Sequence, residues 1–332
     1  MIRHFLKTSD WSSTELSSLL EAAAKLKRGN SGTPLAGRSV ALVFFNPSLR
    51  TRASMQVGIY ELGGNPVILE PGTTSWTLET REGAVMDSDK TEHLKEFVQV
   101  LERYVSAIGV RTFAELKDWD VEKTDPVLNA FAKYSSVPVI NLESAMHHPC
   151  QAMADMLTIR ERFGNTKKKV LLTWSWHPKP LPMAVPNSFI LAAAQFGHDI
   201  RIAHPTGYEL DSSLLRNVES TAKKAGGSVE YSTNVNEAFD NVEVVYAKSW
   251  GGKKFYGSPE TDIAFRADMR RSWIVDAEKM NKTANGIFMH CLPVRRNVIV
   301  TDEVIDSDRS VVIDEAENRL HVQKAILSEL VK

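Results

Sequence analysis

The sequence has few cysteines, no long apolar run and no excess of charge of either sign. Its two cysteines, Cys150 and Cys291, are too few for a disulfide framework, so we expect a reducing compartment, the cytoplasm. No stretch approaches the roughly 18 consecutive apolar residues that a membrane-spanning helix needs, and the first residues lack the apolar run of a secretory signal. Because 40 basic and 41 acidic residues leave a net charge of −1, no global field would draw the chain to nucleic acid or to an anionic membrane.

The composition is that of an ordinary globular protein, with 43% hydrophobic and 24% charged residues. A chain of 332 residues is expected to form about two domains. The sequence contains no repeat of fixed period and no low-complexity segment.

Short apolar runs alternate with helical patterns along the whole chain. The runs are typical of strands that are buried on both faces of a parallel sheet, and they cover residues 40–45, 66–69, 105–110, 137–140, 170–174, 200–203, 242–246 and 287–290. Helices are expected after a capping box at Ser12 and Glu15, over 149–163 with Pro149 at the first position, and over 315–331. This alternation predicts an α/β fold with two doubly wound parallel-sheet domains joined by helices.

A polar turn with two arginines follows the first apolar run, at Ser48-Leu49-Arg50-Thr51-Arg52. A helix that begins there would present free backbone N–H groups and its positive dipole end, and arginine adds bidentate donors that suit a phosphate. The alternative is a loop with two solvated arginines. The nucleotide-binding P-loop pattern is absent, so this turn does not indicate an ordinary nucleotide site.

His147-His148-Pro149-Cys150-Gln151 stands at another expected helix start. A histidine there can donate to a substrate carbonyl, and Gln151 can bond an amide group. The alternative is that His148 caps the helix and Cys150 fills the core. No second histidine, cysteine or carboxylate pair has metal-ligand spacing, so a zinc site is not indicated, and no base is paired with Cys150 as a nucleophile.

The third motif, His290-Cys291-Leu292-Pro293-Val294-Arg295-Arg296, directly follows an apolar run. Ligands bind at the carboxyl ends of strands in α/β sheets, so a backbone carbonyl and an arginine here could bind an amine and an anionic group. A structural turn with solvated arginines is the alternative.

Together, in this order, Ser-x-Arg-Thr-Arg, His-Pro-x-Gln and His-Cys-Leu-Pro resemble the transcarbamylase family over essentially the whole chain. The resemblance implies transfer of the carbamoyl group of carbamoyl phosphate to an amine in amino-acid biosynthesis. It also implies a carbamoyl-phosphate domain over 1–149, completed by the helix at 315–332, and an amine-substrate domain over 150–314. A homotrimer with active sites at the subunit interfaces is the expected assembly.

The resemblance assigns roles residue by residue. The carbamoyl-phosphate site would contain Ser48, Leu49, Arg50, Thr51, Trp76 from a neighbouring subunit, Arg111, His148, Pro149, Cys150, Gln151, Cys291, Leu292 and Arg319. The catalytic residues would be Arg52, Arg111, His148, Gln151, Cys291 and Arg295.

Two segments resemble the branch that acts on N-acylated ornithine in arginine biosynthesis. Residues 246–252 lack the Ser-Met-Gly loop of ornithine transcarbamylases, and residues 174–182 form a proline-rich loop that could wall a pocket rigidly. Acylation removes the positive charge of the α-nitrogen, so a lysine for the α-carboxylate is more useful than an aspartate for an ammonium. The residues that the resemblance assigns to the acylornithine are Glu143, His177, Lys248, Arg295 and Thr91.

The acyl group depends on one position. Where acetyl-type enzymes carry a glutamate and succinyl-type enzymes a proline, this sequence has Thr91, which would not repel the distal carboxylate of a succinyl group. Ile299 likewise replaces a lysine of one acetyl-type enzyme. These features favour N-succinyl-L-ornithine; N-acetyl-L-ornithine, or a non-catalytic carbamoyl-phosphate-binding paralogue, is the alternative.

The expected mechanism is direct attack of the neutral δ-amine on the carbonyl carbon of carbamoyl phosphate, with expulsion of phosphate. Arg52, Arg111 and His148 would stabilise the developing charges. No cofactor and no metal is expected. A nicotinamide-dependent dehydrogenase would share the architecture, but the run at 170–174 is not followed by its glycine-rich fingerprint.

Overall fold

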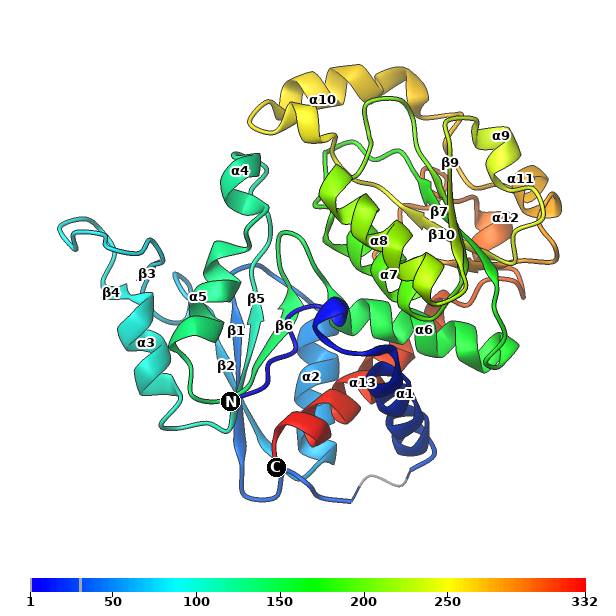
Figure 1. The fold of residues 1–332 in the computed structure, drawn as a ribbon. Helices are drawn as coiled ribbons and strands as arrows, with labels where there is room; N and C mark the ends of the chain where they lie inside the picture. Colours follow the sequence, from blue (N-terminus) through cyan, green and yellow to red (C-terminus); the bar gives the residue numbers. More distant parts are fainter. Residues whose placement is uncertain (1, 30–31) are drawn as a thin grey trace.

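The computed structural model describes residues 2–29 and 32–332 and has two large parallel sheets, one in each half of the molecule (Figure 1). The strand order of the first sheet is β2-β1-β5-β6. Its strands are β1 (Ser39–Phe44), β2 (Asn65–Leu69), β5 (Ala107–Arg111) and β6 (Val139–Glu143). The second sheet has the order β11-β10-β7-β8-β9. Its strands are β7 (Lys169–Trp174), β8 (Asp199–Ala203), β9 (Ser228–Ser232), β10 (Val244–Lys248) and β11 (Ile287–Met289). The prediction of an α/β fold with two parallel sheets is confirmed.

Helices surround both sheets. The first half contains α1 (Ser13–Lys27), α2 (Arg50–Glu61), α3 (Leu94–Leu101), α4 (Trp119–Glu122) and α5 (Pro126–Tyr134). The second half contains α7 (Ala184–Gln195), α8 (Ser212–Lys224), α9 (Val235–Ala238), α10 (Pro259–Arg266), α11 (Ala277–Asn281) and α12 (Asp302–Ile305). Short 3₁₀ turns cover Thr8–Asp10, Lys253–Phe255 and Ala267–Met269. No helix among the described residues is both long and apolar enough to cross a membrane.

Two long helices connect the halves. α6 (Pro149–Phe163) runs between them, and α13 (Val312–Leu330) returns from the second half to pack on α1, α2 and α6 of the first (Figure 1). α6 begins at Pro149 as predicted, and α13 begins three residues before the predicted start. The capping box is also confirmed, because Ser12 Oγ accepts from Glu15 N at 3.3 Å and Glu15 Oε2 accepts from Ser12 N at 2.8 Å.

The strands form where apolar residues run without interruption. All residues from Val40 to Phe44 in β1 are buried, because this strand has neighbours on both edges and helices on both faces. Gly109 in the adjacent strand has no room for a side chain, since a Cβ there would lie 2.8 Å from Leu142. This close packing fixes the carboxyl ends of β1, β5 and β6 side by side.

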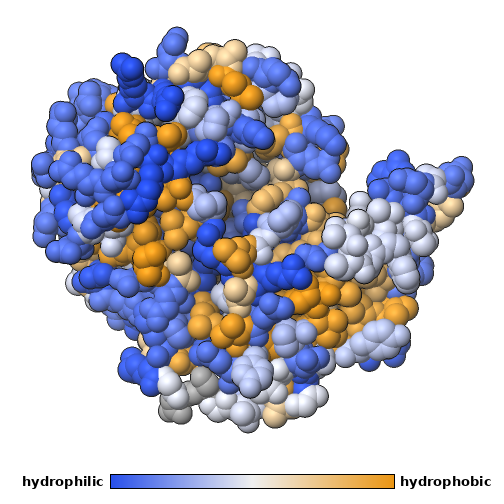
Figure 2. All heavy atoms as spheres, turned by 180° about the vertical axis from the view of Figure 1, so that it is seen from behind, coloured by the Kyte–Doolittle hydropathy of each residue, from blue (hydrophilic) through white to orange (hydrophobic). Residues whose placement is uncertain are grey.

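A segment with the short strands β3 (Leu78–Glu79) and β4 (Glu92–His93) projects from the first half (Figure 1). It carries the exposed side chains of Trp76, Val85 and Met86. Figure 2 views the molecule from behind and shows apolar side chains gathered on the first half beside this projection, with a hollow between the two halves. The sequence patterns did not predict β3 and β4.

Candidate active site

The predicted site residues lie at the carboxyl ends of strands from both sheets. Arg111, Glu143 and Lys248 are the last residues of β5, β6 and β10. His177 follows β7, and the loop with Cys291 and Arg295 follows β11. Side chains from both sheets therefore converge on the region between the halves, where α/β folds bind ligands.

Arg111 is the centre of a buried charged cluster. Its Nη1 donates to Glu143 Oε2 at 2.6 Å and to Thr51 Oγ1 at 3.4 Å, and its guanidinium lies 4.2 Å from the ring of Phe113. Arg319 from α13 donates to the same Thr51 hydroxyl at 2.5 Å. Residues from β5, β6, α2 and α13 thus meet at one point, although they are far apart in the sequence.

Arg50 belongs to the same cluster and begins α2. Burial and the positive charge of Arg111 lower the pKa of Arg50, while Cys291 and Glu143 oppose that shift. The Nε atoms of Arg50, Arg111 and Arg319 are all buried without a hydrogen-bond partner. Three guanidinium groups beside one carboxylate leave a positive site that an anion would complete.

The start of α2 adds donors. Ser48 Oγ accepts from Thr51 N at 3.3 Å, and no side chain caps the helix at Leu49, whose side chain is exposed to 79%. The free N–H groups of this first turn and the helix dipole favour a negatively charged ligand beside Arg50.

His148 stands just before α6, with Nε2 3.5 Å from Glu143 Oε2 and its backbone N–H donating to Ser188 Oγ at 2.7 Å. Burial lowers the pKa of His148 well below its ordinary value, and the positive charges of Arg319, Arg111 and Lys248 lower it further. The imidazole is therefore neutral and can donate one hydrogen bond to a substrate oxygen without adding a charge.

Gln151 lies one turn into α6. Its Nε2 donates to Asp155 Oδ1 at 2.8 Å and to Glu315 Oε1 at 2.9 Å, and its Oε1 is buried without a partner. The two cysteines are also buried. Burial raises the pKa of Cys150 to about 12 and that of Cys291 to about 11, so neither thiol is ionised at neutral pH.

The second half contributes His177, Arg295 and Lys248. Arg295 Nε donates to His177 Nε2 at 2.9 Å. Burial lowers the pKa of His177 to about 4, and the charges of Arg295 and Lys248 contribute, so the ring is neutral and can accept this bond. Lys248 also lowers the pKa of Cys291, which sets its ammonium near the third motif.

Three predicted residues stand apart from this cluster. Arg52 is ion-paired with Glu70 at 2.6 Å, and no described contact joins it to Arg111. Trp76 is 57% exposed on the projecting segment, where its Nε1 donates to Glu92 Oε2 at 2.6 Å. Thr91 is exposed on the same segment, and its backbone N–H donates to Thr77 O. Within a single chain, therefore, the structure does not bring these residues to the site.

The sequence patterns did not point to the ion pair of Arg266 and Asp262, which is almost fully buried. Arg266 donates at 3.3 Å to the carbonyl oxygens of His177, Lys179 and Trp250, so it joins the proline-rich loop to the loop after Lys248. Asp262 and Arg266 have helical i, i+4 spacing, which was the available signal, but this spacing is common in solvated helices.

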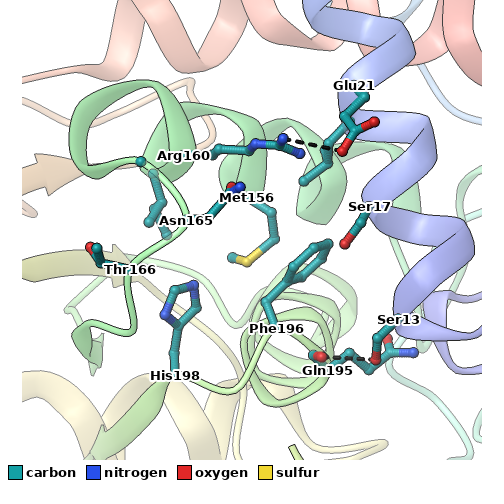
Figure 3. A pocket seen from close by; sticks show the side chains of 13 residues that line it. Ser13, Ser17, Glu21, Met156, Arg160, Asn165, Thr166, Gln195, Phe196 and His198 are labelled. Carbon is teal, nitrogen blue, oxygen red and sulfur yellow. Dashed lines mark hydrogen bonds and ion pairs between the residues drawn. The ribbon is translucent and has the colours of Figure 1, made fainter.

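A separate pocket of about 380 Å³ lies between α1, the end of α6 and the turn after α7 (Figure 3). Arg160, His198 and Phe196 line it, together with Ser17 and Glu21 of α1. None of the predicted site residues lines this pocket. Among the described residues, no group of three histidine, cysteine, aspartate or glutamate side chains could hold a metal ion.

The two α/β halves and the arginine-rich site at their strand ends are typical of a protein that binds an anionic small molecule. Two family profiles match the chain. The carbamoyl-P binding domain of aspartate/ornithine carbamoyltransferase matches residues 3–161, and the Asp/Orn binding domain matches residues 183–330. The chain belongs to the aspartate/ornithine carbamoyltransferase family, in its N-acylornithine branch.

Several relatives are similar over most of their length. The chain is 48% identical to the N-acetylornithine carbamoyltransferase of Xanthomonas campestris pv. campestris, covering 99% of this chain and 98% of that protein. It is 41% identical to the N-succinylornithine carbamoyltransferase of Bacteroides thetaiotaomicron, covering 89% and 88%. A crystal structure of acetylornithine transcarbamylase complexed with acetylcitrulline superposes with a TM-score of 0.97 at 48% identity, covering 100% of both chains.

These likenesses identify the chain as a carbamoyltransferase that acts on an N-acylated ornithine. They do not support the expectation of a succinyl substrate, because the relatives named for the acetyl substrate are more similar than those named for the succinyl substrate. The expectation rested on the absence of a repulsive carboxylate at Thr91, and a missing repulsion does not by itself create a preference for the longer acyl group.

Proposed function

We propose that this enzyme transfers the carbamoyl group of carbamoyl phosphate to the δ-amine of N-acetyl-L-ornithine, which gives N-acetyl-L-citrulline and phosphate. The observation that carries the proposal is the convergence of Arg50, Arg111 and Arg319, each with a buried and unpartnered Nε, beside the neutral His148. The 48% identity to N-acetylornithine carbamoyltransferases supports the acetyl group.

In this proposal the phosphate of carbamoyl phosphate lies at the start of α2. The N–H groups of that turn, the Thr51 hydroxyl and the guanidinium groups of Arg50 and Arg319 bind its oxygens. Arg111 and His148 donate to the carbonyl oxygen, and Gln151 accepts from the carbamoyl amine. Arg52 has no direct role, because its guanidinium already forms an ion pair with Glu70.

The acylornithine lies between the two halves. Lys248 pairs its α-carboxylate, His177 and Arg295 line the same side, and Glu143 faces the reacting end. Free ornithine would bring an α-ammonium close to Lys248 and Arg295, and like charges at such distances disfavour binding.

The reaction proceeds by attack of the neutral δ-nitrogen on the carbonyl carbon. The C–N bond forms, the C=O π electrons move to the oxygen, and the tetrahedral intermediate expels phosphate as the C–O bond to the bridging oxygen breaks. Phosphate takes the proton that the amine loses, so no further base is required. Arg111 and His148 stabilise the oxyanion, and the fixed arrangement of both substrates supplies proximity.

The assembly follows from the projecting segment. Trp76 is exposed and its own chain does not bring it to the cluster. We therefore propose a homotrimer in which Trp76 completes the carbamoyl-phosphate site of a neighbouring subunit, with Thr91 on the same segment close to the acyl group bound there.

The acyl group is tested by the ratio of kcat/KM for N-acetyl-L-ornithine to that for N-succinyl-L-ornithine, in the wild type and in Thr91→Glu. We expect the wild type to prefer the acetyl substrate. Thr91→Glu should increase this preference about ten-fold, because the added carboxylate repels the succinyl carboxylate. Thr91→Gln is the matched neutral control. A higher kcat/KM for N-succinyl-L-ornithine in the wild type would overturn the choice of the acetyl group.

A further inference from the structure

Two carboxyl groups are buried beside Gln151 and have no role in the reaction described above. Asp155 on α6 and Glu315 on α13 both have 0% exposure, and their carboxyl groups lie close enough to affect each other's pKa and both contact the Gln151 amide. In the described part of the chain, their hydrogen-bond partners are Gln151, the Tyr246 hydroxyl and the backbone N–H of His290. None of these partners carries a positive charge and no described salt bridge joins the pair to a cation, although the charge of Arg319 opposes the rise in the pKa of Asp155.

Such a pair retains a proton. Two ionised carboxylates in contact repel each other, and burial disfavours the charged form of both. Burial raises the pKa of Asp155 and that of Glu315, and the negative charge of Asp155 raises the pKa of Glu315 further. The pair therefore holds one proton between its two carboxyl groups.

The pair determines how the Gln151 amide is turned. Both protons of Nε2 are engaged, by Asp155 Oδ1 at 2.8 Å and by Glu315 Oε1 at 2.9 Å. The reverse orientation would bring the amide oxygen against two carboxyl oxygens that have one proton between them. The carbonyl oxygen of Gln151 is thereby left buried and without a partner.

We propose that Asp155 and Glu315 are positioning residues, which share one proton, engage both amide protons of Gln151 and keep its carbonyl oxygen free to accept from the carbamoyl amine. The inference rests on the proposed function, and it explains why the site would prefer a ligand with an NH₂ group to one with a methyl group. A ligand with an NH₂ group at this position satisfies Gln151, whereas a ligand with a methyl group leaves the buried oxygen unpaired.

The Glu315 carboxyl group also contacts the third sequence motif, residues 290–296. Glu315 Oε2 accepts from the backbone N–H of His290 at 2.9 Å, directly before Cys291. α13 therefore links the orientation of Gln151 to the start of the loop that carries Arg295.

The test uses two stable phosphonates that differ in one group. Phosphonoacetamide carries the NH₂ of carbamoyl phosphate, and acetonylphosphonate carries a methyl group there. Calorimetry on the wild type should show about ten-fold tighter binding of the amide, as expected for one hydrogen bond to a buried acceptor. In Asp155→Leu, the Gln151 amide loses one of its two acceptors and the pair loses its shared proton, so the preference should fall by at least about three-fold.

Two further variants sharpen the test. Glu315→Gln replaces the shared proton by an amide donor to Asp155 and keeps an oxygen that accepts from Gln151, so it should keep most of the preference. Thr158→Val is the matched control, since it removes the bond from Asn318 Nδ2 at 2.9 Å between the same two helices and should leave the ratio unchanged. If Asp155→Leu does not fold, the infrared carbonyl stretch of a protonated carboxyl group in the wild type at neutral pH, lost in Glu315→Gln, replaces it.

The outcomes distinguish a failure of the proposed carbamoyl-phosphate site from a failure of the inference about Asp155 and Glu315. A wild type that binds neither phosphonate would overturn the proposed carbamoyl-phosphate site itself. A wild type that binds both equally, an unchanged ratio in Asp155→Leu, or the absence of a protonated carboxyl group would overturn the inference about the pair and leave the proposed function intact.

Discussion

At the scale of single residues, the site is defined by polar atoms that the protein itself leaves without partners. Five such atoms are buried without a hydrogen-bond partner among the described residues: Nε of Arg50, Arg111 and Arg319, Nδ1 of His148, and Oε1 of Gln151. Buried polar groups normally find partners, because an unpaired one costs about 1–3 kcal/mol. A small anion that carries both acceptors and an NH₂ donor would satisfy this set, and carbamoyl phosphate has these groups.

Arg50 and Arg52 make a sharp comparison, because they are two residues apart and only one belongs to the cluster. We predict that Arg50→Gln weakens carbamoyl-phosphate binding by about 10- to 100-fold, the loss of a charge-assisted hydrogen bond. Arg52→Gln should change it by less than about three-fold, as for an exposed ion pair. Calorimetric titration checks both variants, and a larger loss in Arg52→Gln would contradict the assignment.

Motifs that are local in the sequence were predictable at this scale, and contacts between distant residues were not. The turn at 48–52 and the start of α6 at Pro149 follow from spacing and helix-start rules. The contact between Asp155 and Glu315 depends on how α13 packs on α6, which no local pattern contains. The same is true of the hydroxyl of Thr51, which meets Arg111 and Arg319 only after the chain has folded.

At the scale of elements, α10 fixes the relative positions of two loops, the proline-rich loop after β7 and the loop after β10. Arg266 donates to carbonyl oxygens of His177 and Lys179 on one loop and of Trp250 on the other. Asp262 neutralises it at 2.6 Å and accepts from the Tyr208 hydroxyl at 2.6 Å. Backbone hydrogen bonds also join the two loops, from Ser175 N to Lys248 O at 3.0 Å and from Gly251 N to Leu181 O at 2.8 Å, and the buried ion pair adds a side-chain link close to His177.

We predict that Arg266→Met raises KM for the acylornithine and leaves the Kd of carbamoyl phosphate within about two-fold. It should also lower the free energy of unfolding by about 3–5 kcal/mol, because Asp262 would be left buried without its counter-charge. Steady-state kinetics and denaturant titration measure both effects. Arg271→Met, at an exposed position close in the sequence, is the control. An unchanged KM in Arg266→Met would contradict the role of the Arg266–Asp262 ion pair in positioning the loops.

Strands were predictable where they are buried on both faces. The runs in β1, β7 and β10 were recognised because central parallel strands are continuously apolar. β9 was missed, since this edge strand reads Ser-Val-Glu-Tyr-Ser and most of it is exposed or half-buried. β3 and β4 have two residues each, too short for any periodic signal.

At the scale of the whole molecule, exposed apolar side chains are unevenly distributed. Of the 14 large hydrophobic side chains that are exposed among the described residues, ten lie between Ile2 and Val121, including Trp76 and Tyr104. Apolar surface concentrated on one half is typical of a face that binds another protein. This agrees with the proposed trimer, whose interfaces would involve the first half and its projecting segment.

Subunit mixing tests whether sites are shared. We predict that Trp76→Ala and Arg111→Ala each greatly reduce activity, and that the two variants, dissociated and reassembled together, recover part of it. Recovery follows because some hybrid sites would combine the intact Arg111 of one subunit with the intact Trp76 of its neighbour. Light scattering should give a mass about three times 37.1 kDa. No recovery in verified hybrids would show that Trp76 does not act across an interface.

The most direct test of the whole account is ureido-product formation from carbamoyl phosphate with ornithine, N-acetyl-L-ornithine and N-succinyl-L-ornithine measured in parallel. In the proposed site, Lys248 and Arg295 would place two positive charges near an α-ammonium group, so we predict that N-acetyl-L-ornithine is used best and that free ornithine gives no significant product. Efficient use of free ornithine, or no product with any of the three amines, would contradict the account.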